Sequence, residues 1–73
     1  MTLINALDNH WVTISGYAGG KGLETKLRQY GVYPGDRARV IRRAPLGGPI
    51  LVEVDGREIV LGRGIADKIL VEP

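Results

Sequence analysis

Few side chains in this chain of 73 residues could perform catalysis or bind a metal. Its one histidine, His10, lies two residues after Asp8, and it has no cysteine. A Ser-His-Asp arrangement needs partners that this N-terminal segment does not supply. Asp8 and His10 are the candidate metal ligands, but two ligands on a loose segment coordinate iron or zinc poorly. We therefore expect no enzymatic activity, no cofactor and no functional metal site.

A glycine-rich stretch is a second place to look for chemistry. GYAGGKG, residues 16–22, precedes a predicted helix and so invites comparison with phosphate-binding loops. Its spacing fits neither the dinucleotide fingerprint nor the P-loop, because no Gly-Lys-Ser/Thr follows and no strand-helix-strand unit surrounds it. The stretch is therefore interpreted as a flexible turn between a strand and a helix.

Basic residues are concentrated in one part of the chain. The formal net charge is +2, and seven of the ten Lys and Arg residues lie within residues 21–43. Small five-stranded barrels commonly bind RNA or DNA, and Arg42 and Arg43, with Lys26 and Arg28, could follow a phosphate backbone. A base-stacking platform is missing, since no strand alternates aromatic residues outward and Tyr30 falls on the expected buried stripe of a helix. A nucleic-acid-binding small β-barrel is therefore the alternative function, and we expect no nucleic acid partner.

The elements that position these residues centre on a hairpin. Ile50–Leu61 contains two strand-like runs on either side of Asp55-Gly56, the dipeptide preferred in a two-residue type I′ turn. A two-residue turn fixes the register of the hairpin. The expected pairs are Val54 with Arg57, Glu53 with Glu58, Val52 with Ile59, Leu51 with Val60, and Ile50 with Leu61. The core face should consist of Ile50, Val52, Ile59 and Leu61, with Val54.

A third strand, Asp36–Arg43, should pair with this hairpin. The two opposed glutamates repel each other unless a neighbouring strand supplies positive charge. The register that meets this need places Val40 beside Val52, Ala38 beside Val54, Ile41 beside Leu51 and Arg39 beside Glu53. The same alignment brings the apolar faces together, so two independent requirements select one register.

One helix is predicted, over Leu23–Tyr30. Its buried stripe should consist of Leu23, Leu27 and Tyr30, at positions i, i+4 and i+7. Glu24 and Arg28 have the spacing of a surface ion pair. Gly31 should end the helix in a Schellman motif, in which Val32 contacts Leu27.

The remaining elements complete a small barrel. Residues 2–10 are expected to be a loosely packed lead-in and residues 11–15 a short strand. Pro34-Gly35 is a turn signal, and residues 65–68 have room for one helical turn before a closing strand at residues 69–71. The prediction is a mainly β fold: one domain over residues 1–73, forming a small five-stranded SH3-like barrel. One α-helix lies between the first two strands and a short helical turn before the last.

Two observations bear on location. Met1 is followed by Thr2-Leu3-Ile4-Asn5, with no cationic region or long apolar core, so we expect no secretory signal. The lack of cysteine fits the reducing cytoplasm.

The link between the third strand and the hairpin contains two prolines and a glycine pair. In Ala44-Pro45-Leu46-Gly47-Gly48-Pro49 these residues should shape a defined protrusion with Leu46 at its tip. Leu46 could either dock on another protein or fold back over the barrel end.

Taken together, these residues resemble the FeoA family of ferrous iron transport proteins, from Leu3 to Val71. The resemblance rests on the glycine-rich loop and helix closed by Gly31, on Pro34-Gly35, on Arg42 to Pro49, and on Leu61-Gly62-Arg63 through Val71. It implies a cytoplasmic accessory or regulatory protein of ferrous iron uptake. Such a protein would act by binding the cytoplasmic G-protein domain of the FeoB-type transporter, and would reach the inner face of the membrane only through that partner.

The expected partner-binding residues are Pro45, Leu46, Gly47, Gly48 and Pro49 of the loop, with Lys26, Arg42 and Arg43. Self-association through an exposed sheet edge is a further expectation.

Overall fold

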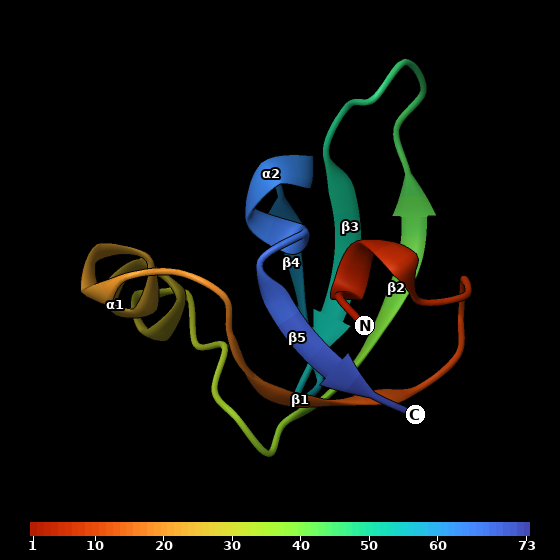
Figure 1. Cartoon of the computed structure of the whole chain (residues 1–73). Coiled ribbons are helices and arrows are strands. Elements are labelled where there is room, and N and C mark those ends of the chain that lie inside the picture. The colour runs from red at the N-terminus through yellow and green to blue at the C-terminus, as the bar shows by residue number, and fades with distance from the viewer.

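The computed structural model describes residues 1–73 and shows a strongly bent antiparallel sheet with two helices (Figure 1). The strands are β1 (Val12–Tyr17), β2 (Arg37–Arg43), β3 (Ile50–Val54), β4 (Arg57–Leu61) and β5 (Ile69–Glu72). The two helices are α1 (Lys21–Gln29) and α2 (Arg63–Ala66), and a 3-10 turn, η1 (Leu3–Asn5), lies near the N-terminus. The strand order is β4-β3-β2-β1-β5. No helix is long and apolar enough to cross a membrane.

The hairpin of β3 and β4 has the predicted register at all five pairs. Asp55 and Gly56 have φ angles of 51° and 80°, as a type I′ turn requires. Glu53 and Glu58 do lie opposite each other, and Arg39 on β2 forms an ion pair with Glu53 at 2.8 Å. The charge argument therefore identified the correct alignment of β2 with β3 over this part of the sheet.

The end of β2 differs from the prediction because the strand contains a β-bulge. Val40 pairs with Val52 as expected, but the next pair is Arg42 with Leu51, so Ile41 is an extra residue and its predicted pairing with Leu51 is wrong. A bulge reverses the alternation of the residues that follow it. Arg43 is consequently opposite the buried Ile50, on the inner side of the sheet, while Arg42 is exposed on the outer side.

The core is entirely apolar and consists of 15 buried residues from every strand and from both ends of the chain. Ile50, Val52 and Leu61 are buried as predicted, whereas Ile59 is only partly buried. The prediction that the N-terminal segment, residues 2–10, packs loosely is wrong, because Leu3 and Ala6 are buried in the core. They are held there because the segment lies against β5, with a bridge from Thr2 to Leu70.

Helix α1 ends in the predicted Schellman motif. Gly31 has φ 81°, its N–H donates to the Arg28 carbonyl, and the Val32 N–H donates to the Leu27 carbonyl. Two expectations about this helix are wrong. Tyr30 is 39% exposed, because the helix ends one residue before it and it no longer follows the buried stripe. Arg28 forms no ion pair with Glu24, because its guanidinium lies over two tyrosine rings instead.

Candidate functional site

The loop between β2 and β3 projects beyond the strands at one end of the sheet (Figure 1). Two hydrogen bonds shape it, from the Ala44 N–H to the Pro49 carbonyl at 3.0 Å and from the Gly48 N–H to the Pro45 carbonyl at 3.1 Å. Leu46 and Gly47 have φ angles of 60° and 71°. This is a tight turn with both central residues in the left-handed region, as in a type I′ turn.

Leu46 is an unusual residue for this position. Left-handed backbone conformations cost a residue with a branched apolar side chain about 1 to 2 kcal/mol, whereas glycine and asparagine adopt them readily. The Leu46 side chain gains nothing in return inside the molecule, because it is fully exposed (102%). The alternative in which Leu46 folds back over the barrel end is therefore wrong. An apolar side chain is held in water on a strained backbone.

Two arginines lie close to the loop. Arg42 is exposed on the outer side of β2 and takes part in no ion pair. Arg63, at the start of α2, places its Cδ atom 3.8 Å from the position a Cβ atom on Gly47 would occupy. The sequence analysis did not single out Arg63, because only the fold brings α2 beside this loop. Lys26 is exposed on α1, which lies on another side of the molecule (Figure 1), so the structure does not bring Lys26 to the loop.

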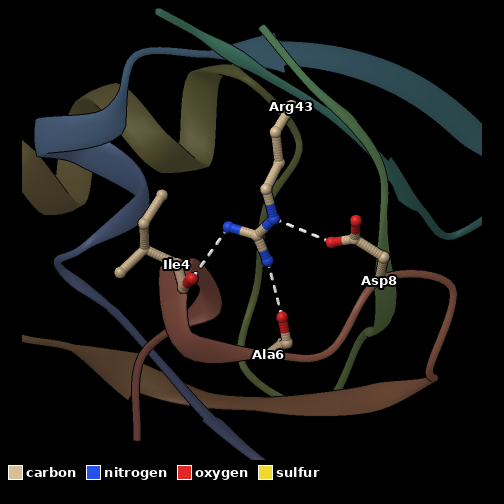
Figure 2. A network of polar contacts seen from close by, with 4 residues as sticks. All are labelled: Ile4, Ala6, Asp8 and Arg43. Atoms are coloured by element: carbon tan, nitrogen blue, oxygen red, sulfur yellow. Dashed lines mark hydrogen bonds and ion pairs between the residues drawn. The ribbon is translucent and has the colours of Figure 1, made fainter. Parts of the chain in front are cut away.

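Arg43 points away from Arg42 and into the structure. Figure 2 shows its guanidinium donating to the Ile4 carbonyl at 2.8 Å, to the Ala6 carbonyl at 2.6 Å and, through Nε, to an Asp8 carboxylate oxygen at 2.7 Å. These three contacts attach the N-terminal segment to the end of β2. Because its hydrogen-bonding groups are already engaged, Arg43 is assigned to this intramolecular network and not to the proposed partner contact.

The candidate metal ligands are not arranged as a metal site. Asp8 is bound to Arg43, and no group of three His, Asp or Glu side chains is close enough to hold an ion. His10 lines an apolar hollow of about 230 Å³ together with Leu7, Trp11 and Val12. This hollow is a second surface feature that the sequence did not indicate.

The aromatic side chains form cation–π contacts. The Arg28 guanidinium lies 5.7 Å from the Tyr17 ring centre and 5.8 Å from that of Tyr33, and Arg39 lies 4.9 Å from the Trp11 ring. The Tyr17 hydroxyl donates to a backbone carbonyl, and burial raises the pKa of this phenol, an effect that the Arg28 charge opposes. Three of the four aromatic rings thus already have a guanidinium beside them and do not form a continuous platform for stacking bases.

Comparison with known proteins connects this geometry to a family. The sequence model of the FeoA domain family matches residues 1–73. A relative from Methanocaldococcus jannaschii, named "Putative Fe(2+) transport protein A", is 33% identical over 67 residues, which are 92% of this chain and 79% of the relative. The solution structure of iron(II) transport protein A from Clostridium thermocellum matches with a TM-score of 0.90 and 32% identity. That match covers 99% of this chain but only 44% of the Clostridium chain.

A second structure supports the predicted architecture. Stenotrophomonas maltophilia FeoA, described as a procaryotic SH3 domain protein, matches with a TM-score of 0.81 at 22% identity. The match covers 99% of this chain and 89% of that chain, and at this identity it bears on the fold alone. The five-stranded SH3-like fold is therefore confirmed. A family match along all 73 residues and a relative above 30% identity show that this chain belongs to the FeoA domain family.

Proposed function

We propose that this chain is a cytoplasmic accessory protein of ferrous iron uptake, without enzymatic activity of its own. It acts as one domain over residues 1–73 and binds the cytoplasmic G-protein domain of a FeoB-type transporter. Family membership and the names of the Methanocaldococcus and Clostridium relatives support the link to ferrous iron. The chain reaches the membrane only through this partner.

The observation that carries the proposal is the exposed, strained Leu46. Residues in unfavourable backbone conformations persist where the surrounding structure imposes them, and they cluster at binding and catalytic sites. The turn would be more stable with asparagine at this position, but asparagine would remove the apolar tip. We therefore assign the partner contact to Leu46, presented by Pro45, Gly47, Gly48 and Pro49.

The test is the substitution Leu46→Asn, which should change stability and binding in opposite directions. Relief of backbone strain should raise the free energy of unfolding by about 1 kcal/mol, which corresponds to roughly 4 to 8 °C in Tm for a domain of this size. Loss of the apolar contact should weaken binding to the transporter's G-protein domain by at least about tenfold. Thermal unfolding and isothermal titration calorimetry, with and without guanine nucleotide, measure the two quantities.

Val60→Thr is the matched control. Val60 is also an exposed apolar residue, at 65%, but lies on β4 and not in the loop. It should leave binding unchanged. The loop assignment is wrong if Leu46→Asn binds like the unsubstituted chain, and the proposed partner is wrong if the unsubstituted chain shows no binding heat under any nucleotide condition.

A further inference from the structure

The molecule carries two exposed apolar features of opposite shape. One is the Leu46 side chain, which projects from the loop between β2 and β3. The other is the hollow of about 230 Å³ that is lined by Leu7, Trp11 and Val12 together with Asn5, His10, Met1 and Pro73. Leu7 is 68% exposed and Trp11 40%, so both side chains leave apolar surface in contact with water.

The wall of the hollow is fixed before any ligand arrives. The Trp11 ring packs against the Arg39 guanidinium at 4.9 Å, and that guanidinium is itself held by Glu53 at 2.8 Å. Val12 is buried at the start of β1 and forms part of the core. A preformed wall loses little conformational freedom on binding, which favours insertion of a small apolar group.

The charges around the two features are complementary. Arg42 and Arg63, close to the Leu46 loop, are exposed, and neither forms an ion pair. Two acidic residues are adjacent in sequence to the lining of the hollow, Asp8 after Leu7 and Glu72 before Pro73, while the nearby cations Arg39 and Arg43 are paired with Glu53 and Asp8. Glu72 has no ion-pair partner, and the Asp8 side chain is 54% exposed despite its contact with Arg43. A leucine entering the hollow would therefore bring the unpaired Arg42 and Arg63 toward the unpaired Glu72.

We propose that the hollow receives Leu46 of a second copy of this chain. The contact is heterologous, because the loop of one copy meets a different surface of the next, and it leaves one free loop and one free hollow at the ends of each assembly. Such contacts produce open chains unless the rotation closes a ring. A single leucine buries little area, so the association is weak and depends on concentration.

This association has a regulatory consequence. A copy whose Leu46 occupies a neighbour's hollow cannot present the same side chain to the transporter. Self-association and transporter binding through the loop therefore exclude each other. Substitutions in the hollow separate the two events, because Leu7 takes part only in self-association.

Sedimentation equilibrium from about 10 µM to about 1 mM tests the contact. The average mass of the unsubstituted chain should rise above the 7.9 kDa of the monomer as concentration increases. Leu46→Asn removes the inserted side chain, and Leu7→Arg blocks the hollow at an exposed position that folding does not require. Each should lower the association constant by about tenfold or more. Val60→Thr should associate like the unsubstituted chain.

Mixing the two variants is the decisive experiment. Leu46→Asn keeps an intact hollow and Leu7→Arg keeps an intact loop, so an equimolar mixture should form a dimer that contains one of each and grows no further. The proposal is overturned by a constant monomer mass across the concentration range, by either variant associating normally on its own, or by a mixture that stays monomeric. Because Leu7→Arg should still bind the transporter's G-protein domain, this result is separable from the proposed function.

Discussion

Replacing Arg43 with alanine should destabilise the protein by releasing its N-terminal segment. The side chain is 26% exposed and donates hydrogen bonds to the Ile4 and Ala6 carbonyls and to Asp8. A hydrogen bond to a charged group contributes about 1.5 to 3 kcal/mol when buried, and a partly exposed ion pair less than about 1 kcal/mol. Allowing for water that replaces part of these contacts, we expect a loss of about 2 to 3 kcal/mol.

That loss is large for a domain whose free energy of unfolding is only about a few kcal/mol. Urea unfolding followed by the fluorescence of the single tryptophan, Trp11, would measure it. Amide hydrogen exchange would locate it, because the Asn9 N–H donates to the Val40 carbonyl at 2.8 Å only while the segment is docked on β2. Exchange at Asn9 should accelerate more than exchange in the β3–β4 hairpin.

Two further variants separate the parts of the network. Asp8→Asn should cost less than about 1 kcal/mol, since the Asp8 side chain is 54% exposed and the backbone contacts of Arg43 remain. Arg42→Ala should leave stability within about 0.5 kcal/mol of the original, because Arg42 lies on the solvent side of the sheet. An Arg43→Ala protein as stable as the parent, with unchanged exchange at Asn9, would refute the reasoning.

Two more predictions concern glycine and tyrosine. Gly31→Ala should be more destabilising than Gly35→Ala, measured by urea unfolding. Both glycines have positive φ (81° and 95°), but an added Cβ at Gly31 would also displace the Arg57 guanidinium, whereas the space beside Gly35 is open. Equal losses would show that the Arg57 contact is unimportant. Burial raises the folded-state pKa of Tyr17. The contribution of the protonated phenol to the free energy of unfolding is therefore present below the unfolded pKa of about 10, and it is lost as pH rises through the folded pKa. Tyr17→Phe should therefore flatten the alkaline decline in Tm, and an unchanged decline would contradict this assignment.

The sequence predicted those parts of the fold that depend on local chemistry. The Asp55-Gly56 turn determines the register of β3 and β4, and the repulsion between Glu53 and Glu58 identified Arg39 as the neighbour they require. Gly31 ended α1 as expected. In each case the determining residues lie next to each other in the chain or on directly paired strands.

The features that were missed depend on long-range packing. Nothing in the alternation of β2 shows that Ile41 is an extra residue, so the inward direction of Arg43 could not be read from the sequence. Burial of Leu3 requires β5, which lies at the other end of the chain. For the candidate site, the protruding loop with Leu46 at its tip was predicted, but the exposure of Leu46 was left open, and Arg63 and the hollow near Trp11 arise only when distant segments meet.

The extra residue at Ile41 also limits how this strand can be altered. Arg42 and Arg43 are the same residue type, yet Arg42 faces water and Arg43 binds the N-terminal segment. The bulge at Ile41 determines which of the two arginines faces inward. Deleting Ile41 would remove the bulge and still leave Arg42 opposite Leu51 and Arg43 opposite Ile50, so both arginines would keep their sides of the sheet. The other paired residues of β2 each oppose one residue of β3, so deleting one of them instead would reverse the inside–outside order of the residues beyond the deletion and should do more harm.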